Sequence, residues 1–173
     1  MKIVSISTSK KKGTVKKQIN EVELIENHGI SGDAHAGDWH RQVSFLSSES
    51  IEKTREQGLD VTFGDFAENI ATEGIDWKEI PIGTKVRLGE GAEVEITQIG
   101  KECHNKCAIY YKAGDCIMPK EGIFASVIKA GASVTILADN DITQKGSIII
   151  VKTGDITYNA GQNIEISASK DTY

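Results

Sequence analysis

Short β-type runs separated by glycine turns recur along this 173-residue chain, and they most limit what it can fold into. Val, Ile and Thr are frequent in these runs, which is typical of strands. Val94 and Ile96 alternate with glutamates as in a half-buried strand, and Gly89 and Gly91 before them predict a tight hairpin. We expect strands at Lys2–Ser7, Glu21–Glu26, Gln42–Leu46, Asn69–Thr72, Thr84–Leu88, Glu93–Ile99, Ser133–Leu137, Ser147–Lys152 and Asn163–Ser167.

Two helices are predicted between these strands. The first covers residues 47–57, because a serine can cap its start, glutamates occupy its first turns and a glycine follows it. The second covers residues 122–130, where Ile123, Val127 and Ala130 would share one face. Many strands and few helices favour a mainly β barrel or sandwich.

Length and charge narrow the class of protein further. The chain is long enough for one domain with a proper core, expected over residues 1–140, with residues 141–173 as a C-terminal β extension or a partly ordered tail. The net charge of −5 does not favour nucleic acid. No segment reaches the roughly 20 apolar residues that span a bilayer, and no signal peptide is visible, so we expect a cytoplasmic protein with reduced thiols.

The three cysteines lie together in one short segment, which is the first candidate for a site of chemistry. Basic residues on either side of Cys103 favour its thiolate, which makes it a candidate nucleophile or metal ligand. Two other interpretations remain open. Cys103, Cys107, Cys116 and His104 could hold a structural zinc ion, or Cys107 and Cys116 could be small buried core residues.

A glycine-rich loop that ends near Arg41 carries several chemically capable side chains. Its glycines would let backbone N–H groups approach an anion, and the guanidinium of Arg41 offers a fork for phosphate. Asp33, His35, Asp38 and His40 could instead ligate a metal, or the loop could be a long turn with aspartate caps and exposed histidines. The concentration of such side chains favours a functional loop.

Two further segments contribute candidates. Hydroxyls and lysines surround a glycine near the N-terminus, so Lys12 or Lys16 could bind phosphate together with Arg41. Glu68 and Asn69 follow a turn with two aromatic residues and stand where a strand begins, and Asn69 is a candidate cofactor-binding residue. A lysine run is usually a solvated loop, and the turn could be purely structural.

Four segments, in this order, resemble the MOSC domain, the molybdenum-cofactor sulfurase C-terminal domain, and in particular its small stand-alone bacterial members. The resemblance covers roughly residues 1–140. It rests on the segments GDAHAGDWHRQVS (residues 32–44), GDFAENI (64–70), ITQIGKECH (96–104) and CIMPKEGIFASVIKAG (116–131).

The resemblance implies a MOSC-type β-barrel with a few short helices and a cysteine tied to molybdenum cofactor or to sulfur carriage. The family's cysteine follows the Thr-Gln strand, which here selects Cys103 as catalytic residue and metal ligand. The expected ligand is molybdopterin or its precursor, held by Lys12, Lys16, His35, Arg41 and Asn69. A sulfur-donating desulfurase or a molybdoenzyme is the expected protein partner, with no role for nucleic acid or membrane.

The resemblance leaves open whether the chain is an enzyme on its own. Some related domains reduce N-hydroxylated compounds with the help of redox partners. Pyridoxal phosphate is associated with the family through an aminotransferase-like domain, and no pyridoxal-phosphate lysine is expected here. The rival hypothesis is a non-catalytic interaction module with a zinc-stapled cysteine loop.

Overall fold

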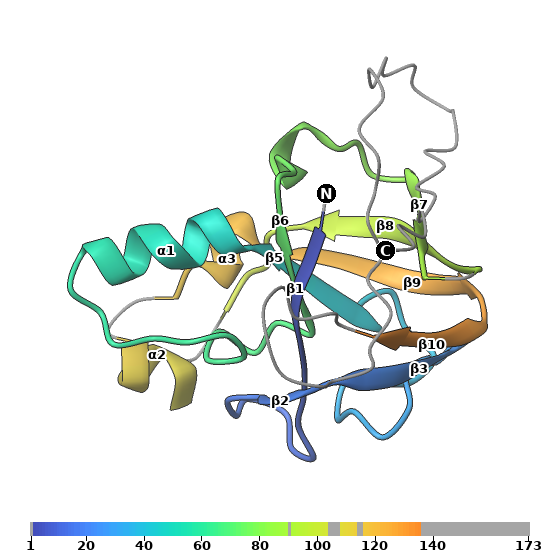
Figure 1. Ribbon diagram of the computed structural model, residues 1–173, viewed down its shortest axis with the longest axis horizontal. Coiled ribbons are helices and arrows are strands. Elements are labelled where there is room, and N and C mark those ends of the chain that lie inside the picture. Colours follow the sequence, from blue (N-terminus) through green and yellow to red (C-terminus); the bar gives the residue numbers. More distant parts are fainter. Residues whose placement is uncertain (1, 90, 104–107, 114–115, 136–173) are drawn as a thin grey trace, which may run out of the picture.

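The computed structural model describes residues 2–89, 91–103, 108–113 and 116–135. Among them the order of elements begins with strands and places three short α-helices later (Figure 1). The elements are β1 Lys2–Thr8, β2 Lys17–Ile19, β3 Glu21–Ile25, β4 Gly29–Ile30, β5 Val43–Ser47, α1 Ser48–Glu56, β6 Ile70–Glu73, the 3₁₀ turn Trp77–Glu79, β7 Lys85–Leu88, β8 Ala92–Ile99, α2 Ala108–Ala113, α3 Met118–Glu121, β9 Ile123–Lys129 and β10 Gly131–Thr135.

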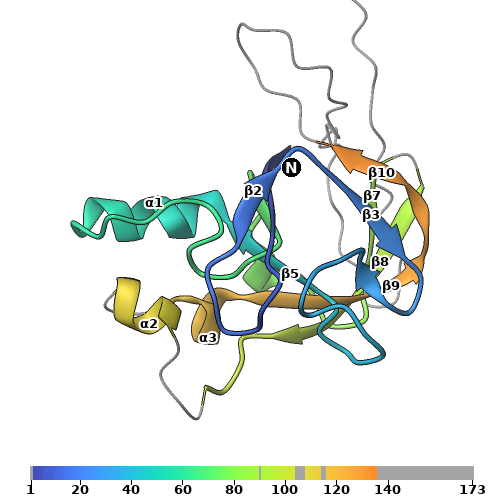
Figure 2. The same ribbon diagram turned by 90° about the horizontal axis from the view of Figure 1, so that it is seen from below.

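A curled seven-stranded sheet in the order β2-β1-β6-β5-β9-β8-β7 forms half of a barrel. A smaller sheet, β10-β3-β4, lies at one end of it, and α1, α2 and α3 gather at the other end (Figures 1 and 2). All described pairs are antiparallel except β5 with β6, which are parallel. The fold is therefore mainly β with a few short helices, as the sequence predicted.

Strand β5 separates two hydrophobic clusters because both of its faces are buried. Val43 and Phe45 point into the larger cluster inside the curled sheet, while Leu46 packs into a smaller cluster with residues of the helical end. Ser44 lies on the same face as Leu46 and is also buried. The second face of β5 thus carries a polar side chain near the helical end of the molecule.

Several predicted elements are confirmed. Helix α1 begins where a serine was expected to cap it, because the side chain of Ser47 accepts a hydrogen bond from the backbone N–H of Ser50. Leu88 pairs with Ala92 across the expected hairpin, and β8 alternates buried and half-buried residues. The predicted strands 147–152 and 163–167, and the predicted extension or tail over 141–173, lie outside the described residues.

The predicted helix over residues 122–130 is wrong, since this segment is the strand β9. Ile123, Ala125 and Val127 alternate along it and are all buried in the larger cluster. Spacings of two and four residues overlap in such a short run, so Ile123 and Val127 fit either pattern. Pairing with β5 on one side and β8 on the other decides in favour of a strand.

Candidate functional site

A pocket of about 350 Å³ opens beside the second face of β5. Its lining comes from four separate stretches: the loop after β1, the glycine-rich loop, β5 with the turn before β6, and the segment after β8. We call it the thiol pocket. It is lined by Lys12, His35, Trp39, Arg41, Ser44, Ala67, Lys101, Glu102 and Cys103.

The glycine-rich loop is anchored to the protein through the carboxylate of Asp33, which is buried. This carboxylate accepts hydrogen bonds from the backbone N–H groups of Ser9 (3.0 Å) and His35 (2.9 Å). The ammonium of Lys16 lies 2.7 Å and 2.6 Å from its two oxygens, and neither side chain is exposed. Asp33 therefore fixes the loop and its neighbour His35 by several charge-assisted bonds.

The ring of His35 joins this ion pair to the pocket. Its Nδ1 lies 3.4 Å from the ammonium nitrogen of Lys16 and 3.4 Å from an oxygen of Asp33. Burial alone would raise the pKa of Asp33, but the hydrogen bonds from His35 and the charge of Lys16 outweigh burial and lower that pKa well below its usual value. Asp33 is thus an anion that orients His35 at the pocket wall.

Behind Lys16 lies a second buried carboxyl group, Glu68. The backbone N–H of Gly64 donates to one oxygen of Glu68, while the other has no partner among the described residues. Burial, with a smaller contribution from the charge of Asp65, raises the pKa of Glu68 to about 7. Gly64 has φ +90°, and a side chain there would collide with the carbonyl oxygen of Lys16, so this packing requires glycine.

Arg41 enters the pocket with unused hydrogen-bonding capacity. Its Nε is buried and has no partner among the residues that the structure describes. Its guanidinium carbon lies 4.9 Å from the ring centroid of Trp39. A buried donor without a partner is costly, so this arrangement is suited to an anion that approaches the guanidinium.

The thiol of Cys103 is exposed at the edge of the pocket. A tight turn at Gly100 precedes it, where the N–H of Gly100 donates to Gly122 O (2.6 Å) and that of Lys101 donates to Pro119 O (3.1 Å). These bonds hold the start of the segment against α3. Cys116 lies elsewhere, buried in the smaller cluster, as one of the open interpretations required.

The structure brings four of the predicted site residues together and sets two apart. Lys12, His35, Arg41 and Cys103 line the thiol pocket. Lys16 is buried behind it, in the pair with Asp33. Asn69 is also buried. Its side-chain oxygen accepts hydrogen bonds from Ser44, and its side-chain nitrogen donates to the carbonyl oxygen of Ser7, so Asn69 connects β5 to β1.

The two metal-site hypotheses from the sequence can be tested only where the structure describes their residues. Within them, no group of three or more His, Cys, Asp or Glu side chains is arranged to hold a metal ion. His40 is exposed and its Nε2 lies 3.0 Å from Gln98. His104, Lys106 and Cys107, which enter the zinc hypothesis and the basic flank of Cys103, lie outside the described residues.

Trp39, Ser44 and Lys101 also line the pocket and were not predicted as site residues from the sequence. Trp39 stands in the loop that was interpreted as functional, and its aromatic ring between histidines and an arginine was the available signal. Ser44 is a small polar residue inside a strand, and only the pairing of β5 shows which way it faces. Lys101 was considered only as a neighbour of the thiol.

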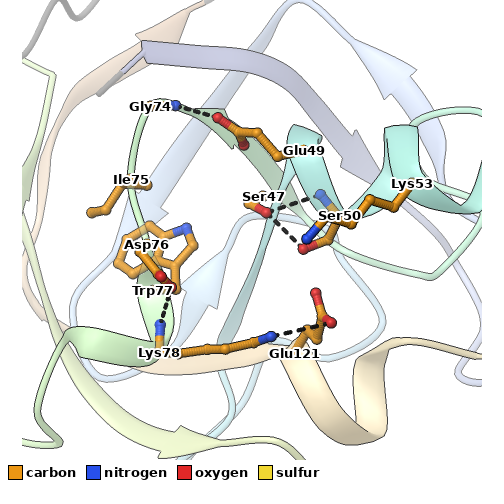
Figure 3. A pocket seen from close by; sticks show the side chains of 10 residues that line it. All are labelled: Ser47, Glu49, Ser50, Lys53, Gly74, Ile75, Asp76, Trp77, Lys78 and Glu121. Atoms are coloured by element: carbon orange, nitrogen blue, oxygen red, sulfur yellow. Dashed lines mark hydrogen bonds and ion pairs between the residues drawn. The ribbon is translucent and has the colours of Figure 1, made fainter.

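A second pocket, of about 310 Å³, lies at the start of α1, and we call it the α1 pocket (Figure 3). Its polar groups bond one another: Glu49 accepts from the N–H of Gly74 (2.7 Å), and Lys78 pairs with Glu121 (3.2 Å). Ser47 caps the helix in the same place. These bonds occupy most of the polar side chains of the α1 pocket.

Comparison with known proteins addresses the family directly. The family model of the MOSC domain matches residues 32–136. The chain belongs to the MOSC domain family. A model described as a hemagglutinin repeat matches residues 123–173, overlapping the end of the MOSC match. No curated protein matches the sequence.

Solved structures of similar fold include proteins from bacteria. The YuaD protein from Bacillus subtilis is 19% identical, with a TM-score of 0.64 over 78% of this chain and 90% of that one. YiiM from Escherichia coli is 23% identical, with a TM-score of 0.55 over 83% and 73%. The MOSC chain spans 65% of the length of a further neighbour, titled a hypothetical protein, which is 24% identical with a TM-score of 0.58 over 78% of this chain.

The helices described in this MOSC protein are all short. Within the described residues, none combines the length and the apolar character that a membrane-spanning helix needs.

Proposed function

We propose that the protein binds the molybdenum cofactor, or its molybdopterin precursor, in the thiol pocket, with Cys103 as a metal ligand or a persulfide carrier. One observation carries the proposal. A single pocket brings an exposed thiol together with Lys12, His35 and Arg41, although these residues come from three separate segments of the chain. Membership of the MOSC family supports the same ligand class.

The residues present fit this ligand in chemistry and in size. The pocket, at about 350 Å³, lies within the range of roughly 300–1,000 Å³ usual for small-molecule sites. A thiolate is a soft ligand suited to a thiophilic metal, and lysine and arginine suit a phosphate group. The buried Nε of Arg41, which has no partner among the described residues, is the structural feature that most favours an anion.

Each pocket residue has a role in this proposal. Arg41 and Lys12 would bind the phosphate, and the sulfur of Cys103 would bind the metal, whose redox chemistry the cofactor supplies when bound. His35 is held at Nδ1 by Asp33 and Lys16, so its Nε2 is the nitrogen left to contact a ligand. Ser44 and Ala67 close the inner wall.

Persulfide carriage would use the same thiol in a different way. The Cys103 thiolate would attack the terminal sulfur of a donor persulfide and form a new S–S bond with it. The S–S bond of the donor would break, and the cysteine sulfur of the donor would leave as a thiolate. An exposed thiol can be reached by a donor protein, and Cys103 meets this requirement. The expected protein partner is then a desulfurase or a recipient molybdoenzyme, in the cytoplasm.

Cofactor retention tests the proposal. Wild type, Cys103→Ser and Lys78→Ala would be purified from cells that make the cofactor, and pterin would be measured by fluorescence after acid oxidation. We expect pterin in wild type and in Lys78→Ala, which alters only the α1 pocket, and a loss of most of it in Cys103→Ser. Wild type without pterin, together with stoichiometric zinc that persists in Cys103→Ala, would contradict the proposal and support the zinc-stapled module.

Limited alkylation mapped by mass spectrometry tests the choice of cysteine. Cys103 is exposed and Cys116 is buried, so Cys103 should be labelled before Cys116 near neutral pH. If Cys107 or Cys116 is labelled first and Cys103→Ser still retains its pterin, the functional thiol is not Cys103.

A further inference from the structure

Three cations of the thiol pocket are held against aromatic rings. Lys12 Nζ lies 4.8 Å from the centroid of the Trp39 ring, and the guanidinium carbon of Arg41 lies 4.9 Å from the same centroid. Arg41 also lies 5.7 Å from the ring of Phe124, and Lys101 lies 6.0 Å from it. Two rings therefore hold positive charges that come from three separate segments.

Several cations elsewhere in the protein are paired with carboxylates. Lys16 pairs with Asp33, Arg55 with Glu52, and Lys78 with Glu121. By contrast, in the part of the chain that the structure describes, Lys12, Arg41 and Lys101 form no ion pair with a carboxylate, although Glu102 also lines the pocket. A ring face attracts a cation without accepting its N–H hydrogen bonds in the ordinary way, so those donors stay available to a ligand.

The ring of Trp39 is itself fixed in place. Its Nε1 donates to the carbonyl oxygen of His35 (2.7 Å), and its backbone N–H donates to that of Gly37 (3.1 Å). The indole also stacks on the imidazole of His35, with centroids 6.3 Å apart and planes 13° apart. Because His35 is anchored to Asp33, the indole is a rigid surface against which flexible lysine and arginine side chains can be ordered.

We propose that Trp39 is a positioning residue that orders Lys12 and Arg41 into a preformed site for a doubly charged oxyanion, such as a phosphate monoester. This inference rests on the proposed function only in taking the thiol pocket as a ligand site. Ordering the cations before binding removes part of the entropy cost of binding. Trp39 acts through the cations, so its contribution is separable from their charge.

Isothermal titration of the full chain with inorganic phosphate and with pyrophosphate tests this role. We expect Trp39→Leu to weaken binding about tenfold, as the loss of two cation–π contacts implies, and Trp39→Phe to stay near wild type because it keeps a ring face. The affinity of Trp39→Leu should depend on salt as steeply as that of wild type, since no charge is lost. Arg41→Ala should weaken binding and also flatten the salt dependence.

As a matched control, an aromatic ring that contacts a cation outside the thiol pocket can be substituted. Arg55 lies 5.3 Å from the ring of Phe63, and Phe63→Leu should leave phosphate binding unchanged. Fluorescence gives a second readout, because the chain has only two tryptophans and Trp77 is 3% exposed. Phosphate should change the emission of wild type and not that of Trp39→Phe, where only Trp77 remains.

Three results would overturn the inference: no phosphate or pyrophosphate binding by wild type, wild-type affinity in a folded Trp39→Leu, or equal losses in Trp39→Leu and Trp39→Phe. The pterin measurement on Cys103→Ser is independent of these. Unchanged phosphate binding in Trp39→Leu alongside pterin loss in Cys103→Ser would remove Trp39 and keep the proposed function. If the Trp39 variants bind phosphate as expected but wild type carries no pterin, the role of Trp39 is kept and the proposed function is removed.

Discussion

The thiol pocket and the α1 pocket have similar sizes, about 350 and 310 Å³, but their polar groups are arranged in opposite ways. In the α1 pocket, Lys78 faces Glu121 and Glu49 faces a backbone N–H. In the thiol pocket, Arg41 and Lys12 face aromatic rings, and the Nε of Arg41 has no partner among the described residues. Volume alone would not tell the two apart.

The difference shows where a ligand can gain free energy. A ligand entering the α1 pocket would have to compete with bonds that already exist, so the exchange is nearly neutral. A ligand entering the thiol pocket would meet donors that are held in place and, among the described residues, without a partner. Two carboxyl groups of this region, Asp33 and Glu68, are instead buried behind the pocket and support the loops, while Glu102 is exposed in the lining. Four predictions test whether the two pockets differ in this way.

The largest effect is expected from removing the buried carboxylate behind the thiol pocket. Asp33→Ala leaves the ammonium of Lys16 buried without its partner, which typically costs about 3–5 kcal/mol. Urea unfolding at neutral pH measures this loss in free energy of unfolding. A loss below about 1 kcal/mol would mean that the Lys16–Asp33 pair is not the anchor of the loop.

The raised pKa of Glu68 should make the free energy of unfolding depend on pH. Its pKa in the folded protein is raised to about 7 from an ordinary value of 4.5, so the folded state holds a proton that the unfolded state releases. This contribution is full below pH 4.5 and is lost as the pH rises through about 7, by roughly 3 kcal/mol in total. Glu68→Gln should remove that decline, measured by urea unfolding between about pH 5 and 8. A decline that persists in the variant would assign it to another group.

Removing one cation from each pocket should affect anion binding differently. Arg41→Ala should weaken phosphate binding by about 1.5–3 kcal/mol, the usual value of hydrogen bonds to a charged group. Lys78→Ala removes a cation from the α1 pocket and should leave binding unchanged, because that cation is paired with Glu121. Equal effects of the two variants in calorimetric titrations would abolish the distinction drawn between the pockets.

The smallest effect is expected from the ion pair of the α1 pocket. The side chains of Lys78 and Glu121 are 54% and 24% exposed, and solvent-exposed pairs contribute less than about 1 kcal/mol. Glu121→Gln should therefore change the free energy of unfolding by less than that amount at low salt. A loss comparable to that of Asp33→Ala would show that the α1 pocket is as tightly coupled to the fold as the wall of the thiol pocket.

The sequence predicted the parts of this structure that depend on local patterns. Alternation identified β8, and a serine followed by glutamates identified α1. The failure at residues 122–130 arose because pairing with β5 and β8, which a sequence pattern does not contain, makes Ile123–Lys129 a strand. Element type in short apolar runs is decided by such distant partners.

The candidate site shows the same limit at the level of single residues. Lys12, His35, Arg41 and Cys103 were identified because their chemistry is unusual for their positions, and all four line one pocket. Lys16 and Lys12 look alike in the sequence, yet one is buried against Asp33 and the other is exposed at the pocket. Only the approach of the glycine-rich loop to the loop after β1 distinguishes them.

The scattered origin of the thiol pocket couples ligand binding to the whole fold. Its walls come from residues between 12 and 103, so the pocket exists only when β1, β5 and β8 are assembled. A ligand that binds there and not to the unfolded chain adds about 2.7 kcal/mol to the free energy of unfolding at a hundredfold excess over its dissociation constant. The melting temperature of the protein is therefore a ligand sensor, and it can rank a library of phosphorylated pterins and other oxyanions even where no reaction can be assayed.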